Sequence, residues 1–441
     1  MIKTFFSPLY IRINKSVHYP MLLFVLKWLL IAAIIGTCIG SVSALFLWLL
    51  DEATYYREQH GYIIGLLPLG GLLIGFLYYY LDKGVEAGSN QILEEIENPQ
   101  KVIPFKMAPL VLIGTIATHF FGGSAGREGT ALQMGGAISD QFTRIFRLKP
   151  RDRTILLIIG LSAGFSAVFG TPLAGAVFGL EVFLIGRLKY NAIFPSFIAA
   201  IIADYITTSC GILHTHYAVP FVPNLTIPNI LYCILAGMIF GLTARLFSGS
   251  IHLISDIFKN KIHYPPLRPF VGGIIVAAFV FLTADTRYIG LGIPVIQESF
   301  EQAVPVYDFI LKLVLTAVTL GASFKGGEVT PLFFIGATLG NALSFFIPLP
   351  MALLAGIGFV SLLSGAVNTP IASTLVAIEL FGLEIGAYAA IACVVSYLFS
   401  GHSGIYTAQG IGSSKHAFNK REEGKKIAAI PVFRKNVKIK R

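Results

Sequence analysis

The chain has 441 residues, of which 55% are hydrophobic and only 13% charged, and its mean hydropathy is +0.74. Soluble globular domains carry about 25% charged residues, so this composition excludes an ordinary soluble domain and indicates a multi-pass membrane protein. The net charge of +10 is concentrated in residues 415–441, which hold ten Lys or Arg residues against Glu422 and Glu423. We expect this tail to follow the positive-inside rule rather than to bind nucleic acid.

Apolar segments of two kinds follow one another along the chain. The longer runs include 21–50, 61–81, 191–210, 230–247, 269–282 and 385–399, and a full crossing needs about 20 apolar residues. Others, at 131–138, 172–184 and 370–381, are short and bounded by Gly or Pro. Broken helices are tolerated at membrane depth only where protein or water surrounds them, so the pattern favours a channel or secondary transporter.

The motif GGSAGREGT at 122–130 places Arg127 and Glu128 between glycines in an almost continuously hydrophobic region. A glycine-rich turn that opens a helix leaves backbone N–H groups unpaired at the positive end of the helix dipole, which suits an anion. Glu128 is then a tethered anion that could hold such a site and release it on protonation. Charged residues at membrane depth usually face a pathway, although Glu128 could instead cap its own helix.

Two motifs recur in the same order. Glu128 and Glu328 are 200 residues apart, and the TPLAGAVFGLE motif at 171–181 recurs 198 residues later as TPIASTLVAIE at 369–379. This predicts two related halves, about 20–220 and 228–410, with a transport site at their interface. The spacing does not decide between parallel and inverted repeats. Glu181 and Glu379 are both expected to end helices near the cytoplasmic face, in structural roles.

The basic residues predict the topology and the domain boundaries. The tail at 415–441 and the segment 144–153 are expected in the cytoplasm, so both termini are cytoplasmic and the protein is placed in the bacterial inner membrane. Residues 1–414 are expected to form the transport domain, and no regulatory domain is expected after it. The four cysteines are scattered and lack a CxxC pair, which disfavours a metal site.

GREGT at 126–130, the paired motifs at 171–181 and 369–379, and HSGIYTAQ at 402–409 resemble the CLC family of anion channels and antiporters, from about residue 20 to 410. The resemblance implies an all-α inverted-repeat bundle of 16–18 tilted and broken helices that forms a homodimer. It also implies one anion pathway per subunit. It assigns the external gating glutamate to Glu128, the central serine to Ser89 and the inner tyrosine to Tyr406.

Three departures from the chloride-type pattern resemble the fluoride/proton antiporter branch. Asn90 follows Ser89 in GSNQI, where the chloride type has GSGIP; GEVTP at 327–331 places Glu328 and Thr330 in normally apolar positions; and Val182 replaces a second, inward glutamate. We therefore expect fluoride export in exchange for protons. A chloride/proton antiporter or a chloride channel of the same family is the alternative.

The expected site has three groups of residues. Glu128, assisted by Glu328, transfers protons and gates. Asn90 and Thr330 supply compact hydrogen-bonding groups for a small anion, although Asn90 could simply cap a turn. Thr330 and Val329 could alternatively adjoin a structural Na⁺, and no other cofactor is expected. The residues expected to bind the anion are Ser89, Asn90, Tyr406, Gly126, Arg127 and Gly129.

Other function classes have weaker support. GHSG at 401–404 superficially resembles a serine-hydrolase motif, but a nucleophile needs a base placed by the fold, and no further motif supplies one. An enzyme is therefore not expected. The lack of a Walker A motif leaves ATP-driven pumping unsupported. The short polar turns argue against a transporter of organic anions.

Overall fold

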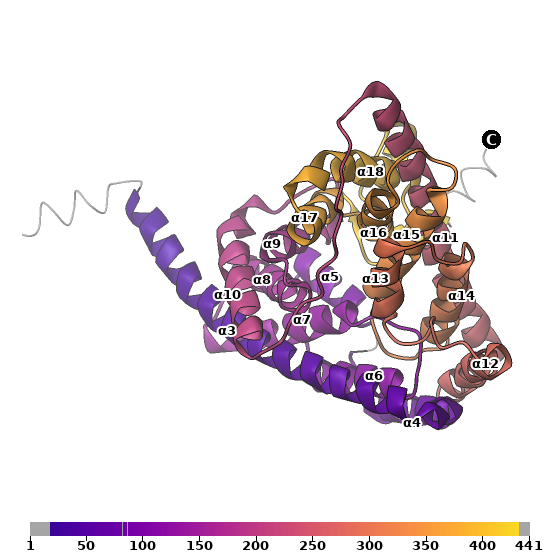
Figure 1. The fold of residues 1–441 in the computed structure, drawn as a ribbon. Coiled ribbons are helices and arrows are strands. Elements are labelled where there is room, and N and C mark those ends of the chain that lie inside the picture. The colour runs from indigo at the N-terminus through magenta and orange to yellow at the C-terminus, as the bar shows by residue number, and fades with distance from the viewer. Residues whose placement is uncertain (1–17, 82, 86, 432–441) are drawn as a thin grey trace, which may run out of the picture.

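The computed structural model describes residues 18–81, 83–85 and 87–431, which form an all-α bundle of sixteen α-helices (Figure 1). The expected helical fold with 16–18 helices is confirmed. The helices are α3 His18–Gln59, α4 Leu67–Leu81, α5 Ser89–Glu97, α6 Met107–Phe120, α7 Glu128–Ile145, α8 Pro150–Phe169, α9 Pro172–Glu181, α10 Ile193–Ser209, α11 Ile227–Lys261, α12 Leu267–Thr283, α13 Ile293–Glu301, α14 Asp308–Gly321, α15 Val329–Leu343, α16 Met351–Val367, α17 Pro370–Phe381 and α18 Gly386–Phe399.

Proline and left-handed residues set the helix boundaries of the broken segments. α9 and α17 each begin at a proline, whose missing N–H and fixed φ suit the first helical position. α8 ends before Gly170, which has φ 69°, and α16 ends before Asn368, which has φ 64°. Each pair α8–α9 and α16–α17 is thus a helix interrupted by a sharp turn. α9, with 10 residues, and α17, with 12 residues, are too short to cross a bilayer alone.

α9 and α17 lie side by side and cap each other through a carboxylate (Figure 1). Glu181, the last residue of α9, accepts hydrogen bonds from the backbone N–H groups of Ile371 and Ala372 at 3.1 and 2.9 Å. These two N–H groups lie in the first turn of α17, where they have no partner within their own helix. The carboxylate therefore satisfies unpaired donors and opposes the helix dipole.

The reciprocal cap shows that the repeats are inverted. Glu379, near the end of α17, accepts hydrogen bonds from Leu173 N at 2.9 Å and Ala174 N at 2.8 Å, in the first turn of α9. Each helix thus ends where the other begins. The expectation that Glu181 and Glu379 lie near the same face is wrong, because inversion of the second half carries Glu379 to the opposite end of the helix pair.

The segment after α18 folds back onto the bundle and forms what we call the C-terminal face. The short strands β1 Leu184–Ile185 and β2 Gly410–Ile411 pair in parallel. Residues 415–431 of the basic segment pack against this region: Ile427 N donates to Gln409 O at 3.0 Å, and Lys426 forms an ion pair with Glu94 at 2.7 Å. Residues 432–441 lie outside the described residues.

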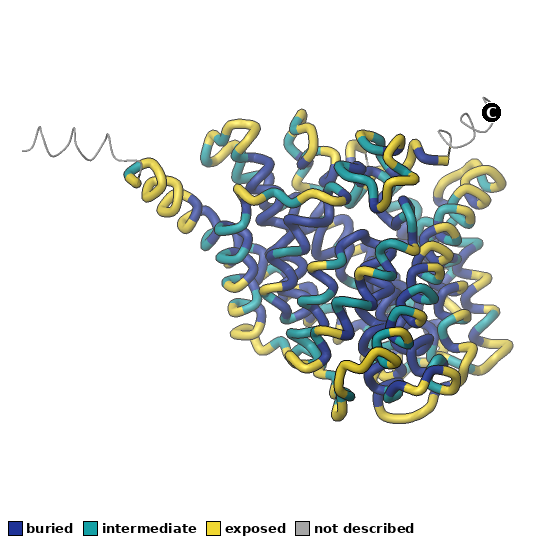
Figure 2. Tube along the Cα trace, turned by 90° about the horizontal axis from the view of Figure 1, so that it is seen from above, coloured by how far each residue is buried: buried dark blue, intermediate teal, exposed yellow. Residues whose placement is uncertain are grey.

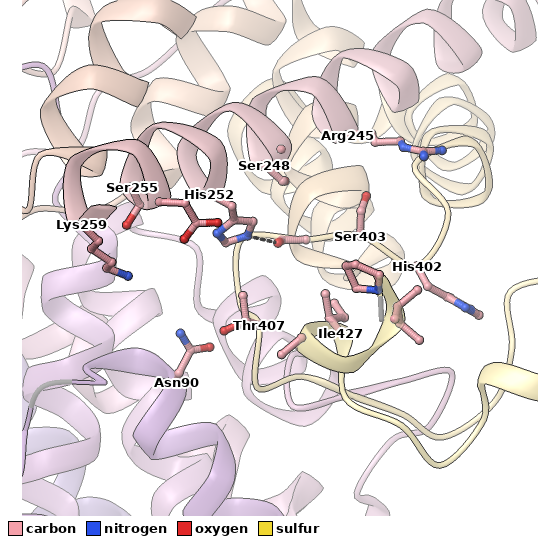
Figure 3. A pocket seen from close by; sticks show the side chains of 16 residues that line it. Asn90, Arg245, Ser248, His252, Ser255, Lys259, His402, Ser403, Thr407 and Ile427 are labelled. Atoms are coloured by element: carbon pink, nitrogen blue, oxygen red, sulfur yellow. Dashed lines mark hydrogen bonds between the residues drawn. The ribbon is translucent and has the colours of Figure 1, made fainter. Parts of the chain in front are cut away.

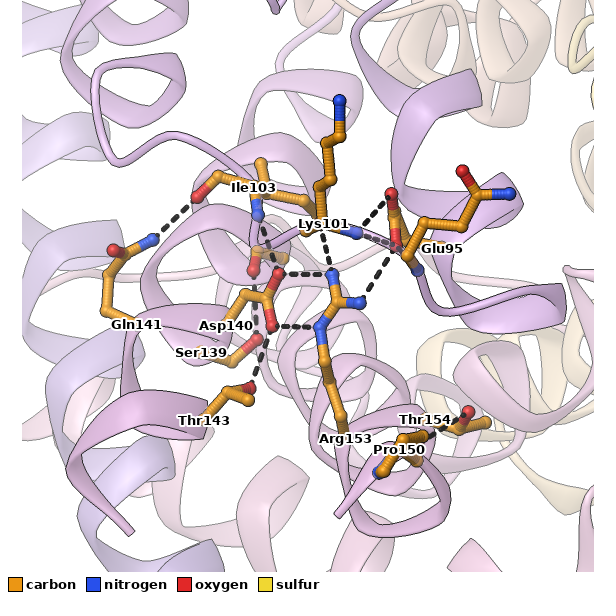
Figure 4. A network of polar contacts seen from close by, with 12 residues as sticks. Glu95, Lys101, Ile103, Ser139, Asp140, Gln141, Thr143, Pro150, Arg153 and Thr154 are labelled. Carbon is orange, nitrogen blue, oxygen red and sulfur yellow. Dashed lines mark hydrogen bonds and ion pairs between the residues drawn. The ribbon is translucent and has the colours of Figure 1, made fainter. Parts of the chain in front are cut away.

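The interior holds most of the buried residues (Figure 2), and it includes a network of paired polar side chains. In the network of Figure 4, Arg153 on α8 donates to both oxygens of Asp140 on α7, at 2.7 and 2.8 Å, and to Glu95 on α5 at 2.8 Å. The Asp140 side chain is fully buried. The Arg153 guanidinium therefore links α5, α7 and α8. Two of these helices, α5 and α7, begin at the predicted site residues Ser89 and Glu128.

Replacing Arg153 with Met should lower the melting temperature of the detergent-purified protein markedly. The loss of one partner leaves the Asp140 carboxylate buried and unpaired, which typically costs about 3–5 kcal/mol. Lys27→Met is the matched control, because Lys27 and Asp152 form an ion pair with side-chain exposures of 42% and 29%, and exposed pairs contribute about 0–1 kcal/mol. Equal shifts in the two variants would contradict the structural role of the Arg153 network.

Candidate functional site

The centre of the bundle is a pair of helix N-terminal turns joined through their backbones. Gly126 N donates to Gly327 O at 2.6 Å, and Gly327 N donates to Gly126 O at 2.7 Å, so the two turns run antiparallel. α7 begins at Glu128 on one side of this bridge, and α15 begins at Val329 on the other. The positive ends of two helix dipoles, one from each half of the chain, therefore meet here.

The Glu128 carboxylate crosses from its own turn to the other half of the chain. Oε1 accepts a hydrogen bond from Thr330 Oγ1 at 2.5 Å, and Oε2 accepts from Thr330 N at 3.0 Å and from Arg127 N at 3.2 Å. The residue is fully buried. The carboxylate thus occupies an anion site made by the N-terminus of α15 and one hydroxyl.

Arg127 supplies positive charge beside this carboxylate. Its Nε lies 3.8 Å from Glu128 Oε1, and the Arg127 side chain is 14% exposed. This Nε is buried and has no hydrogen-bond partner in the structure. Buried donors are usually satisfied, so Arg127 retains a donor that a small anion next to Glu128 could engage.

The second half of the chain does not repeat this arrangement. Glu328 Oε2 lies 3.5 Å from where a Cβ on Gly129 would be, so the Glu328 carboxylate is close to the start of α7. The hydroxyl of Thr130, which corresponds to that of Thr330, is hydrogen-bonded to Thr115 Oγ1 at 2.6 Å. The hydroxyl is therefore engaged elsewhere, and no hydrogen bond links it to Glu328.

Ser89 and Tyr406 belong to two further turns. Ser89 begins α5 directly after Gly88, whose φ of 53° suits glycine, and a Cβ there would lie 3.1 Å from Gln133 Oε1. Tyr406 is 3% exposed, and its hydroxyl has no hydrogen-bond partner in the structure. An orphaned buried hydroxyl is a natural contact for an anion or a water molecule.

Asn90 lines a cavity of about 800 Å³ on the C-terminal face (Figure 3). Its Oδ1 accepts a hydrogen bond from Ala408 N at 3.0 Å, which fixes the turn that carries Tyr406. His252 and Thr407 line the same cavity. Asn90 therefore positions the Tyr406 turn, and its amide Nδ2 carries the donors that could meet an anion.

Val329 and Thr330 begin α15, and both are buried. Val329 contributes an apolar side chain to the core, whereas the Thr330 hydroxyl is engaged by Glu128. No group of three or more His, Cys, Asp or Glu residues is placed to hold a metal ion within the described ranges. A structural Na⁺ bound through the Thr330 hydroxyl and carbonyl groups stays a prediction.

Sequence reasoning missed the amide network behind Tyr406. Gln409 Nε2 donates to Val182 O at 2.6 Å and to Val367 O at 3.0 Å, while Asn368 Nδ2 donates to Gln409 Oε1 at 2.8 Å. Gln409 is fully buried and Asn368 is 1% exposed. The sequence could have indicated Asn368 and Gln409, because both are amides in hydrophobic regions and a buried amide needs hydrogen-bond partners.

Gly126→Ala should lower the melting temperature, because the new Cβ would lie 2.9 Å from Gly327 O, Glu128 Oε2 and Pro331 Cδ. Overpacking of this kind typically costs about 1–3 kcal/mol. Gly249→Ala is the control, since no atom lies within 4 Å of that Cβ position. Thermal unfolding in detergent measures both, and an unchanged melting temperature for Gly126→Ala would mean that the two turns are not rigidly paired.

Comparison with known proteins agrees with this geometry. Residues 70–401 match the family described as "Voltage gated chloride channel". A "Chloride/fluoride channel protein" of Pseudomonas syringae pv. tomato is 51% identical over 92% of this chain and 91% of its own length. The "H(+)/Cl(-) exchange transporter ClcA" of Klebsiella pneumoniae is 28% identical over 80% of each chain.

Two solved structures extend the comparison. A "CLC-type fluoride/proton antiporter" has a TM-score of 0.85 and 34% identity, and the match covers 90% of this chain and 99% of the other. A "slow cyanobacterial Cl-/H+ antiporter" has a TM-score of 0.74 at 20% identity, over 94% and 99%, which shows the shared fold alone. With the matched family model and the paired helix turns, these findings show that the chain belongs to the CLC family of voltage-gated-type chloride channels and antiporters.

Proposed function

We propose that this protein exports fluoride from the cytoplasm in exchange for protons, and that it catalyses no covalent reaction. The observation that carries the proposal is the Glu128 carboxylate, which occupies the anion site at the N-terminus of α15. An anion that takes this site must displace the carboxylate, and a protonated carboxyl group gives the site up. One residue thereby links anion movement to proton movement.

Two observations favour fluoride over chloride as the substrate: the hydrogen-bond donors around the Glu128 carboxylate, and the names of similar proteins. Fluoride is small and strongly hydrated, so a site that removes its water must offer several compact hydrogen-bond donors. Thr330 Oγ1, Thr330 N and Arg127 N already converge on Glu128 at 2.5 to 3.2 Å. The names of the Pseudomonas relative and of the antiporter structure at 34% identity both include fluoride, which supports the same choice.

The protein then works as a homodimer in the bacterial inner membrane, with both termini and the C-terminal face in the cytoplasm. The basic residues near this face support the orientation by the positive-inside rule. Five helices among the described residues are long and apolar enough to cross a bilayer. Apolar side chains exposed on α9, α10, α17 and α18, namely Leu173, Ile201, Ile371 and Val394, offer a surface for the second subunit.

Liposomes containing the purified protein and loaded with fluoride or chloride test the substrate. An anion-selective electrode should report fast fluoride efflux with negligible chloride efflux, and a proton gradient should drive fluoride against its own gradient. Equal or faster chloride efflux would contradict fluoride selectivity and would favour a chloride/proton antiporter. Fluoride efflux that no proton gradient can drive uphill would favour a channel.

Glu128→Gln should abolish proton-driven uphill fluoride movement, because the amide occupies the same volume but cannot exchange a proton. Glu301→Gln, on an exposed glutamate at the end of α13, is the matched control and should keep the wild-type coupling ratio. The measurement records fluoride and proton fluxes in the same vesicles. Preserved coupled exchange in Glu128→Gln would rule out the proposed proton-transfer role.

A further inference from the structure

A basic groove lies between the end of α4 and the start of α12. It encloses about 530 Å³, and the loop that precedes α15 forms one of its walls. Its lining includes four cationic side chains, and no Asp or Glu is among the described residues that line it. The four cations are Lys83, Lys259, Arg268 and Lys325. Such an excess of positive charge favours an anionic ligand.

Three of the cations in this groove, Lys83, Lys259 and Arg268, have no carboxylate partner among the described residues. Arg268 Nε donates to Ile262 O at 2.9 Å, which holds the guanidinium at the start of α12. Lys325 Nζ lies 3.9 Å from the centre of the Tyr78 ring, a cation–π contact. Two of the cations are thus held in place beside the groove.

A cluster of aromatic rings lies beside the groove, and Tyr79 of this cluster lines it. Tyr79 packs against Tyr264 and Tyr80, with ring centres 5.5 and 5.3 Å apart, and Phe76 lies 6.4 Å from Tyr264. Tyr80 is 67% exposed and Tyr79 is 48% exposed. Tyrosines are enriched where a membrane protein meets the headgroup layer, because one end of the ring is apolar and the other polar.

The groove opens at the C-terminal face, at the level of that aromatic cluster. Lys259 lines both the groove and the cavity of Figure 3, which also contains His402 and Asn90. The helices on either side continue into apolar surface that faces outward: Leu73 on α4 is 65% exposed and Leu267 on α12 is 41% exposed. The positive charge therefore meets an apolar surface at one edge of the bundle, which is the arrangement that a phospholipid requires.

We propose that this groove binds the headgroup of an anionic phospholipid from the leaflet at the C-terminal face. The phosphate lies among the four cations, and the acyl chains follow the exposed leucines of α4 and α12. Basic pockets between transmembrane helices bind acidic headgroups in this way. A soluble polyanion would use the charges but not the aromatic and apolar borders.

The site also adjoins the transport machinery. Lys325 is three residues before Glu328, in the loop that leads to α15, and a Cβ on Gly114 of α6 would lie 3.0 Å from the Lys325 side chain. A bound headgroup would therefore touch the loop from which the Glu328 turn emerges. Lipid composition would then influence the segment that carries this carboxylate.

Thermal unfolding of the detergent-purified full chain tests the proposal, with dioctanoyl phosphatidylglycerol as the probe. The melting temperature should rise with the concentration of this lipid and then saturate. Dioctanoyl phosphatidylcholine and inorganic phosphate should produce no comparable rise. Equal stabilisation by phosphatidylcholine would overturn the requirement for negative charge, and stabilisation by phosphate alone would identify a free-anion site instead.

The paired substitution K83Q/K259Q should weaken the apparent phosphatidylglycerol affinity by roughly fivefold per cation, about 25-fold in all. Both side chains are exposed, so the fold should persist. K149Q/R151Q removes two exposed cations from a different segment and should stay within twofold of wild type. Unchanged affinity in K83Q/K259Q, or an equal loss in both double variants, would overturn the assignment of the site to this groove.

Discussion

The pair of backbone hydrogen bonds between Gly126 and Gly327 is the constraint on which the site depends. It holds the first turns of α7 and α15 antiparallel, so that a carboxylate from one half of the chain reaches the unpaired N–H groups of the other. Only glycine allows so close an approach at Gly126. The two halves thus form one site for a carboxylate that neither could form alone, and in the proposed function Glu128 competes with the transported anion for it.

Elsewhere in the bundle, too, side chains from one helix satisfy polar groups of another. Glu181 and Glu379 cap the first turns of α17 and α9, and Arg153 on α8 joins α5 and α7 through the carboxylates of Glu95 and Asp140. In a membrane, a broken helix leaves backbone groups that water cannot reach, and each must find a partner in the protein. The reciprocal caps therefore permit the breaks that bring helix N-termini to the centre of the protein.

The repeated motifs were enough to predict the two halves, the helical bundle and the place of Glu128, because glycine, proline and charge at fixed offsets leave few alternatives. Long-range pairing was not readable in the same way. Two contacts join segments that are hundreds of residues apart in the sequence. The Thr330 hydroxyl is hydrogen-bonded to Glu128, and Asn90 holds the turn before Gln409. The spacing of the motifs also left the orientation of the repeats open. The expectation that Glu379 lies near the same face as Glu181 was therefore wrong.

The most direct test of the account is a titration of fluoride binding by isothermal calorimetry, on the wild-type protein and on Glu128→Ala. If the carboxylate is a tethered competitor, its removal frees the donors of Thr330 and Arg127. Because hydrogen bonds to a charged group contribute about 1.5–3 kcal/mol, we predict at least tenfold tighter fluoride binding to the variant. Equal or weaker binding would contradict the claim that Glu128 and the anion occupy the same site.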